Sequence, residues 1–281
     1  MEKISILNNF DKKNYFSYPY PFFYIDEAYS EKTYSYLEKD YKQFHDYFKK
    51  DSRYKENNIR LQISTEEFLN SKLFQNSIWK DFIDFHTSKS FFIELMNIFE
   101  EDLNIIYPKI SKIINEKKND NDFLNIRNEN NKNNFNFVAD CQPGINTPNA
   151  YKSSVVNSHL DNSAELVAGL FYLKDDRDNA SGGDLQIMEE KSSKKIIFHK
   201  KQRVKNNLDL KLFKEIKYKR NNVVFFLNTS KSIHRVSSRS PSSIPRNLTN
   251  IIFETYIPEN KLFSIYKKTN LASKIVKWLK G

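Results

Sequence analysis

The spacing of apolar residues divides the chain into a helical first part and a strand-rich second part. Ser30 can cap a helix, because apolar residues follow it every three or four positions, at Tyr34, Leu37, Tyr41, Phe44 and Phe48. A capping box at residues 64–67 predicts the start of another helix. A third helical stripe consists of Phe92, Leu95, Phe99 and Leu103. Stripes of this kind are typical of helices that pack against a core.

Short apolar runs separated by polar turns dominate the second part, and their length is that of β-strands. These runs cover residues 165–173, 182–187, 222–227, 232–236 and 246–256. An earlier strand is predicted at residues 21–26. Between the two parts, residues 116–136 are rich in asparagine, lysine and aspartate, which predicts a loop.

The strand pattern brings a His-x-Asp pair into a position where it can bind a metal. His159 and Asp161 are two residues apart, so on a strand both side chains point to the same face. His234 lies on the short strand 232–236, and Arg246 begins the last strand. Two imidazoles and one carboxylate form mononuclear non-haem iron sites that leave positions open for O2 and a co-substrate. The other histidines, His45, His86 and His199, lie in contexts typical of structural residues.

These residues and strands together resemble a known enzyme family. Residues 135–257 resemble the catalytic core of the 2-oxoglutarate- and Fe(II)-dependent dioxygenase superfamily, in particular its prolyl 4-hydroxylase-like branch. The resemblance is carried by His159-Leu-Asp161, Leu-Phe-Tyr-Leu173, Gly182-Gly183-Asp-Leu, Val-Val-Phe-Phe226, His234-Arg-Val236 and Arg246. It implies an α+β fold with a double-stranded β-helix (jelly-roll) core that is buttressed by N-terminal helices.

We therefore expect a single oxygenase domain over residues 1–281, built from four segments. These are a support region with one strand and mostly helices at 1–116, a polar loop at 117–136, the catalytic core at 137–258 and a helical tail at 259–281. In the tail, Leu271, Ile275 and Leu279 share one helix face among lysines. Such a helix packs on its own domain, on a homodimer mate or on a membrane surface.

The resemblance implies a set of site residues. His159, Asp161 and His234 would bind Fe(II), and Arg246 would pair with the distal carboxylate of 2-oxoglutarate. An arginine suits this role, because its planar guanidinium can donate two parallel hydrogen bonds to a carboxylate. Arg239 remains a second candidate for the clamp, being closer to His234. A hydroxyl or amide partner for 2-oxoglutarate is also expected, and the candidates are Tyr151, Asn157 and Tyr172.

Two segments depart from the family pattern. Residues 219–222 read Lys-Arg-Asn-Asn, where family members often have a glycine and an acidic residue. Residues 244–246 read Ile-Pro-Arg, without the glycine that often precedes the co-substrate arginine. Neither departure affects an expected ligand, but both weaken the assignment to a branch.

The implied activity is hydroxylation of a C–H bond by O2, coupled to conversion of 2-oxoglutarate to succinate and CO2, with ascorbate as a candidate reductant. Peptidyl proline, an amino acid or a small metabolite all fit as substrates, because substrate is recognised by loops that vary freely on a fold. The carboxylate of Asp161 argues against the halogenase variant of the superfamily. The alternative is a catalytically inactive double-stranded β-helix protein that binds a metabolite or a partner.

The charge of the chain raises the question of a nucleic-acid substrate. The net charge is +10, and basic residues gather in residues 191–219. However, Arg239 and Arg246 lack the spacing of the paired arginines in the family's nucleic-acid demethylases. We therefore expect a small-molecule or peptide substrate rather than a nucleic acid.

Cysteine and glycine usage add two expectations. The single cysteine, Cys141, excludes an intrachain disulfide, and no apolar run has the length of a signal-peptide core or a membrane span, so we expect a cytoplasmic protein. Four of the five glycines gather near the His-x-Asp pair, where they indicate tight turns or close backbone approach. They are Gly144, Gly169, Gly182 and Gly183.

Overall fold

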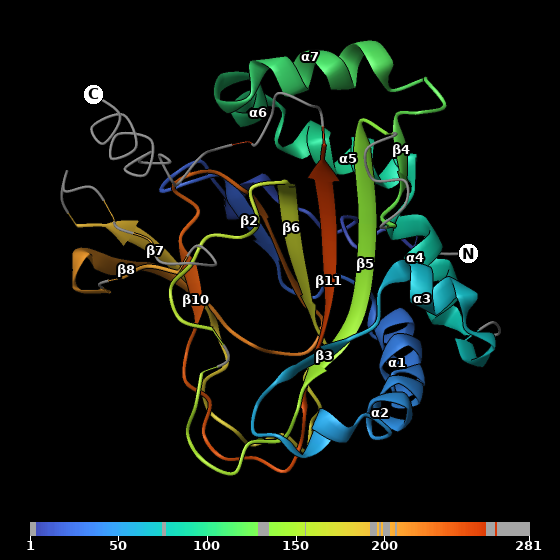
Figure 1. Cartoon of the computed structure of the whole chain (residues 1–281), viewed down its shortest axis with the longest axis vertical. Coiled ribbons are helices and arrows are strands. Elements are labelled where there is room, and N and C mark those ends of the chain that lie inside the picture. The colour runs from blue at the N-terminus through green and yellow to red at the C-terminus, as the bar shows by residue number, and fades with distance from the viewer. Residues whose placement is uncertain are drawn as a thin grey trace, which may run out of the picture.

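The chain is described by a computed structural model that covers residues 4–74, 77–128, 135–154, 156–191, 196, 198, 203–205, 207–256 and 262. Helices and sheets are both present, as the sequence predicted (Figure 1). The helices are α1 Glu31–Asp40, α2 Lys42–Phe48, α3 Thr65–Asn70, α4 Ile78–His86, α5 Lys89–Ile98, α6 Glu100–Ile106 and α7 Pro108–Lys117. The strands are β1 Tyr15–Phe16, β2 Phe22–Ile25, β3 Arg60–Gln62, β4 Leu124–Ile126, β5 Phe137–Asn146, β6 Glu165–Tyr172, β7 Leu185–Glu190, β8 Leu210–Ile216, β9 Asn222–Leu227, β10 His234–Val236 and β11 Arg246–Thr255.

The strands form two sheets. The larger sheet has the order β1-β2-β9-β6-β11-β5-β3, and β4 pairs in parallel with β5. The smaller sheet has the order β10-β7-β8 and lies beside the larger one (Figure 1). Most neighbours in the larger sheet are distant in sequence, so its register brings together residues from both ends of the chain.

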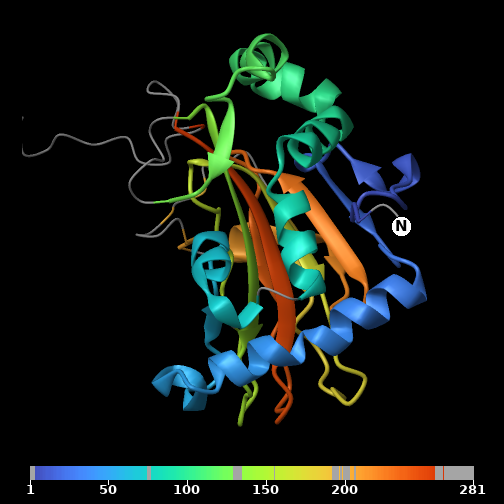
Figure 2. The ribbon, with the colours of Figure 1, turned by 90° about the vertical axis from the view of Figure 1, so that its right-hand side faces the viewer.

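The two faces of the larger sheet bury different clusters. Along β6, Val167 and Phe171 pack into the cluster shared with the helices, whereas Ala168 and Tyr172 pack toward the smaller sheet. This division follows from the period of two along a strand. Figure 2 shows the helices covering one face of the sheet, which leaves the opposite face to contact β7, β8 and β10.

The helices begin where the sequence predicted and are shorter than the apolar stripes. The Ser30 hydroxyl accepts a hydrogen bond from the Thr33 N–H, and the Ser64 hydroxyl accepts one from the Glu67 N–H. The first stripe divides into α1 and α2 at Tyr41, whose N–H is shared by the carbonyls of residues 37 and 38. The third stripe divides into α5 and α6 at Phe99. The side chains of both stripes still face the core.

Two local predictions are wrong, and others lie outside the described residues. Residues 117–136 were predicted as a polar loop, but α7 extends to Lys117, and residues 124–126 form β4 because their backbone pairs in parallel with β5. The segment that carries His159 was predicted as a strand, but His159 forms only isolated bridges, to His234 and to Arg203. The backbone here is shared between two partners, since the His159 N–H donates to the carbonyl of His234 and the Ser158 carbonyl accepts from the N–H of Val204. The predicted tail helix and His199 fall outside the described residues. Among the described helices, none has the length and apolar character needed to cross a bilayer.

Candidate functional site

His159, Asp161 and His234 come together on the side of the larger sheet that faces the smaller one. One potential ligand atom from each of the three lies within 4.8 Å of the others. The Asp161 Oδ1 atom is 3.4 Å from Nε2 of His159 and 3.6 Å from Nε2 of His234. Both imidazoles therefore present the same nitrogen toward one carboxylate, in the arrangement expected of a three-ligand metal site with open positions.

Backbone carbonyls orient the two imidazoles. Nδ1 of His159 lies 2.9 Å from the carbonyl of Asn157, and Nδ1 of His234 lies 2.9 Å from the carbonyl of Ser232. A neutral imidazole that donates from Nδ1 keeps the lone pair of Nε2 free for a metal. Burial lowers the pKa of His234 to about 4, although the nearby Asp161 carboxylate acts in the opposite direction. His234 is therefore neutral at physiological pH, which is the form that binds a metal.

Asp161 is ionised in the same site. Burial opposes its ionisation, but the electrostatic effect of His234 and the hydrogen bond to His159 together lower the pKa of the carboxyl. Two imidazole nitrogens and one carboxylate form a donor set suited to Fe(II). The chemistry of the three side chains thus fits the metal that the resemblance implies.

Arg246 lies at the start of β11 and is 1% exposed. Its Nε donates to the carbonyl of Gly183 at 3.0 Å, and its Nη1 donates to Oδ1 of Asn146 at 3.1 Å. Its guanidinium carbon lies 5.0 Å from the ring centre of Tyr172 and 4.7 Å from that of Tyr218. A Cβ atom on Gly183 would lie 3.2 Å from the Arg246 side chain, so a residue without a side chain leaves room for the arginine here.

Three buried donors around Arg246 have no hydrogen-bond acceptor among the described residues. They are Nη2 of Arg246, the hydroxyl of Tyr172 and Nδ2 of Asn146. Burial raises the pKa of the Tyr172 hydroxyl, with Arg246 opposing the shift, so this hydroxyl keeps its proton. Buried donors without acceptors are costly and mark a place for a ligand. A carboxylate, which only accepts hydrogen bonds, is the group that satisfies all three.

The structure separates the candidates for co-substrate binding. Tyr172 lies against Arg246, whereas Tyr151 is 63% exposed and the side chain of Asn157 is exposed. None of the three candidates is among the described residues that line the cavity at the histidines, so contact with Arg246 is what distinguishes Tyr172. Asn146 was missed by sequence reasoning, because only the register that places it opposite Arg246 reveals it.

Arg239, the second candidate for the clamp, already has a carboxylate partner. Its Nη2 atom lies 2.8 Å from Oδ1 of Asp178 and donates to the carbonyl of Ile244. Its Nη1 atom donates to Oδ1 of Asn149 at 2.5 Å. Both members of the ion pair are buried. These contacts join three loop segments, which is a structural task.

A cavity of about 340 Å³ opens at the three candidate metal ligands. Apolar side chains from both sheets form part of its wall, among them Leu170, Leu185 and Phe226. The rest of the wall is polar and comes from the far strands of the larger sheet and nearby loops. This polar wall consists of Arg60, Gln62, Arg127, Gln142, Glu165 and Asn250. Sequence reasoning did not single out any of these six residues.

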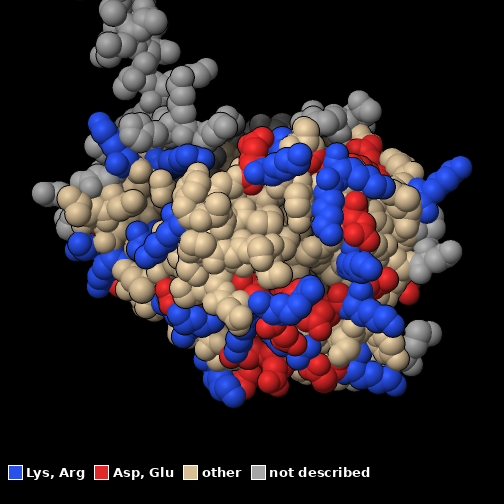
Figure 3. Space-filling model, turned by 90° about the horizontal axis from the view of Figure 1, so that it is seen from below, with Lys and Arg blue, Asp and Glu red and all other residues tan. Residues whose placement is uncertain are grey.

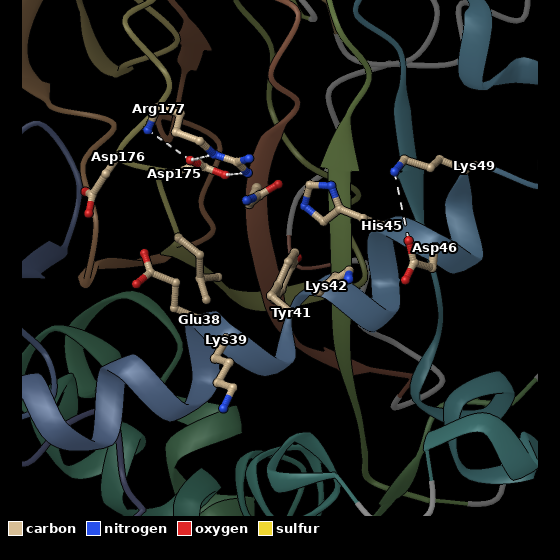
Figure 4. Close-up of a pocket in the computed structure, with 12 residues that line it drawn as sticks. Glu38, Lys39, Tyr41, Lys42, His45, Asp46, Lys49, Asp175, Asp176 and Arg177 are labelled. Atoms are coloured by element: carbon tan, nitrogen blue, oxygen red, sulfur yellow. Dashed lines mark hydrogen bonds and ion pairs between the residues drawn. The ribbon is translucent and has the colours of Figure 1, made fainter.

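A larger cavity of about 630 Å³ lies on the helix side of the sheet, away from the histidine pair (Figure 4). Residues of α1, α2 and the loop after β6 line it, including Tyr41 and His45. Several of its charges are paired within the cavity wall, as Arg177 is with Asp175 and Lys49 with Asp46 (Figure 4). Its lining contains no set of potential metal ligands among the described residues, so its size does not make it the reaction site.

The surface charge is mixed where it can be seen. In Figure 3, lysine and arginine side chains alternate with aspartate and glutamate around a broad area without formal charge. A basic face of one sign would have favoured a polyanionic partner. This view of the molecule does not present such a face.

Comparison with known proteins adds independent information about the central part of the chain. Residues 147–253 match the family model described as the 2OG-Fe(II) oxygenase superfamily. The comparison with curated proteins gives no significant match. Among solved structures, a prolyl 4-hydroxylase from Phytophthora capsici is similar at 14% identity, over 99% of this chain and 72% of that one, with a TM-score of 0.42. A prolyl-4-hydroxylase from Pseudomonas putida is similar at 11% identity, over 83% and 92%, with a TM-score of 0.41.

The two structural similarities are distant, whereas the family match covers the segment that carries the site. His159, Asp161, His234 and Arg246 all fall within the matched residues. Residues 147–253 thus match the 2OG-Fe(II) oxygenase superfamily, in agreement with the resemblance in the sequence.

Proposed function

We propose that the protein is an Fe(II)- and 2-oxoglutarate-dependent dioxygenase that hydroxylates a C–H bond of a small polar molecule. One observation carries the proposal. The His159, Asp161 and His234 cluster opens into a cavity on the same sheet face as Arg246, beside which three buried donors lack acceptors. A metal at the cluster and a dicarboxylate beside it would satisfy both groups of side chains.

Within this proposal, the three clustered side chains hold Fe(II) through the two Nε2 atoms and the Asp161 carboxylate. Fe(II) bound there would supply the activation of O2, for which oxidative loss of CO2 from 2-oxoglutarate, giving succinate, provides the electrons. One oxygen atom ends in succinate and the other in the hydroxylated product. The carbonyls of Asn157 and Ser232 keep both imidazoles in the tautomer that binds the metal.

Arg246, Tyr172 and Asn146 would hold the distal carboxylate of 2-oxoglutarate. The Arg246 guanidinium is fixed by the Gly183 carbonyl and by stacking on two tyrosine rings, so little side-chain entropy is lost when the ligand binds. The apolar side chains of Leu170, Leu185 and Phe226 would exclude water from the reacting centre. The protein's own contribution is therefore orientation and desolvation.

We further propose that the two sheets form the double-stranded β-helix of this superfamily. The support comes from their arrangement, with an apolar cluster between them and helices on the outer face of the larger sheet. Residues 137–258 would then be the catalytic core and residues 1–116 its support. The connecting segment at 117–136, which contains β4, and the predicted tail at 259–281 complete the proposed organisation.

Succinate formation by the purified protein tests the proposal. With Fe(II), ascorbate and 2-oxoglutarate, the wild-type protein should form succinate even without its substrate, at a low uncoupled rate. Mutations in the outer partners of metal ligands change affinity or activity by about 10- to 100-fold, so His159→Ala, which removes a ligand, should lower succinate formation by about 100-fold or more. His159→Ala should also lose stoichiometric binding of Mn(II) in titration calorimetry.

His45→Gln is the matched control, because His45 lies on the helix side of the sheet and outside the proposed site. It should bind Mn(II) and form succinate at the wild-type rate. If the wild-type protein binds neither Mn(II) nor 2-oxoglutarate, the chain is instead an inactive member of the fold that binds another molecule.

A further inference from the structure

Arg60 lies in the same row of the larger sheet as Arg246. Strand β3 pairs with β5 so that Arg60 is opposite Asn146, and Asn146 is opposite Arg246 on its other side. Residues opposite one another on adjacent strands point to the same face. Arg60 lines the cavity at the histidines, and its strand lies two strands away from that of Arg246.

The Arg60 guanidinium has no anionic partner in the described part of the chain. Its Nη1 atom donates to Oδ1 of Asn250 at 3.3 Å, and its Nε atom is buried without an acceptor. Other arginines near the site differ in this respect, because Arg127 pairs with Asp140 and Glu254, and Arg239 pairs with Asp178. Burial and the neighbouring charge of Arg246 lower the pKa of Arg60 to about 10, so it still carries its charge at neutral pH.

A partly buried guanidinium without a counter-charge is unfavourable, and an anionic ligand would relieve the cost. In the proposed function, 2-oxoglutarate brings two carboxylates, of which one binds at the metal and the other at Arg246. Both carboxylates of 2-oxoglutarate would therefore already have a binding partner other than Arg60. The charge on Arg60 then remains available for the second molecule that enters the cavity, the one that is hydroxylated.

The rest of the polar wall indicates the kind of molecule. Gln62, Gln142 and Asn250 supply neutral amides, which hydrogen-bond polar groups without adding charge. Glu165 lines the same cavity, and burial raises the pKa of its carboxyl, so it adds a hydrogen-bonding group to the wall rather than a counter-charge for Arg60. One free guanidinium matches one carboxylate better than it matches a doubly charged phosphate.

The size of the cavity agrees with a small ligand. Its volume of about 340 Å³ lies near the lower end of the range of about 300–1,000 Å³ usual for small-molecule sites. Resting on the proposed function, we propose that the substrate is a small carboxylic acid with polar groups, of the free amino acid class, and that Arg60 binds its carboxylate next to the metal site.

The twenty common L-amino acids and their carboxamides are the probes that test this inference. Each is added to the protein with Fe(II), ascorbate and 2-oxoglutarate, and succinate formation is measured. Binding is measured separately, as the shift in melting temperature of protein loaded with Mn(II) and 2-oxoglutarate. At least one amino acid should stimulate succinate formation and raise the melting temperature, and its carboxamide, which lacks the charge, should do so at least about tenfold more weakly.

Arg60→Gln should raise the half-saturating concentration of the stimulating amino acid by about tenfold or more, and by a larger factor than that of 2-oxoglutarate. Arg60→Lys keeps the charge without the planar pair of donors and should give a smaller increase. Arg53→Gln is the matched control, because this exposed arginine of the preceding segment pairs with Asp51 and with no other carboxylate of the described residues. It should behave as the wild type does.

Three results would overturn the inference. The first is that none of the amino acids binds or stimulates a protein that does form succinate. The second is that acid and carboxamide, or wild type and Arg60→Gln, respond equally. The third is that Arg60→Gln affects 2-oxoglutarate more than the amino acid, which would make Arg60 part of the co-substrate site. If the wild-type protein does not bind 2-oxoglutarate at all, the proposed function itself is contradicted. The comparison of acids with carboxamides uses the wild-type protein, so it does not depend on whether a variant folds.

Discussion

At the scale of single residues, the buried arginines near the site differ in the groups that surround their positive charge. Arg239 and Arg246 both follow His234 and both are almost completely buried. Arg239 has the carboxylate of Asp178, whereas Arg246 has a carbonyl, an amide and two aromatic rings. A cation with neutral partners can accept an anionic ligand, and one with a bonded carboxylate cannot do so without breaking its ion pair.

This difference predicts opposite results for two equivalent substitutions. Arg246→Gln should raise the half-saturating concentration of 2-oxoglutarate by about 10- to 100-fold, because a charge-assisted pair is lost. Arg239→Gln should instead lower the free energy of unfolding by about 3–5 kcal/mol, because it leaves the Asp178 carboxylate buried without a counter-charge. Titration with 2-oxoglutarate and unfolding in urea measure the two effects.

The loss of stability should be smaller for Arg246→Gln, since no carboxylate loses its partner. If Arg239→Gln were instead the variant that needs more 2-oxoglutarate, Arg239 would be the residue that binds the distal carboxylate. The unsatisfied donors of Arg246, Tyr172 and Asn146 would then need another ligand.

At the scale of elements, alternation along the strands decides which side chains reach the cavity. On β6, Gly169 occupies a position on the face that packs against the helices, as Val167 and Phe171 do on either side of it. The ring of Phe225 on the neighbouring strand occupies the space beside it. An added Cβ atom would lie 2.2 Å from that ring, so the absence of a side chain at residue 169 lets the two strands pair with Phe225 in place.

Gly169→Ala should therefore destabilise the protein by about 1–3 kcal/mol, the usual cost of overpacking a core, through displacement of the Phe225 ring. Unfolding in urea measures the change. Ala164→Ser, in the half-exposed turn just before β6, is a suitable control that should change stability by less than about 0.5 kcal/mol. A stable Gly169→Ala protein would show that Phe225 moves away at little cost.

At the scale of the whole molecule, His86 ties the N-terminal segment to the helical layer. It is completely buried at the end of α4. Its Nδ1 lies 2.7 Å from the carbonyl of Phe82, and its Nε2 accepts a hydrogen bond from the N–H of Ile6 at 3.1 Å. The ring can make both contacts only as a neutral imidazole with its proton on Nδ1. Burial lowers the pKa of His86 to about 3, although the carbonyl of Phe82 partly opposes the shift.

A depressed histidine pKa predicts a loss of stability in acid. Above the unfolded-state pKa of 6.5, His86 is neutral in both states and has no effect. As the pH falls from 6.5 toward 3, only the unfolded chain binds the proton, so the free energy of unfolding decreases. At pH 5 the loss from this residue should be about 2 kcal/mol relative to pH 7.

Urea unfolding of wild type and His86→Gln at pH 7 and pH 5 isolates this contribution, because the other titrating groups are common to both proteins. The decrease between the two pH values should be about 2 kcal/mol larger for the wild type. An equal decrease in both would mean that His86 becomes protonated within the folded protein.

The sequence by itself determined the features that depend on neighbours along the chain. Helix starts at Ser30 and Ser64 follow from side chains that bond the next turn, and the assignment of strand faces follows from the period of two. The ligand candidates His159, Asp161 and His234 could be named because their spacing and strand contexts are local properties. Even there, the segment around His159 was predicted as a strand and is only a bridged loop.

Only the tertiary structure decided which distant residues lie together around the proposed site. Tyr172 rather than Tyr151 or Asn157 lies against Arg246, Asn146 joins them through its register with β11, and Asp178 removes Arg239 from consideration. Arg60 reaches the cavity because an edge strand pairs with β5. Each of these placements depends on hydrogen-bond register between strands far apart in sequence, and apolar spacing along one strand contains no information about which partner lies opposite it.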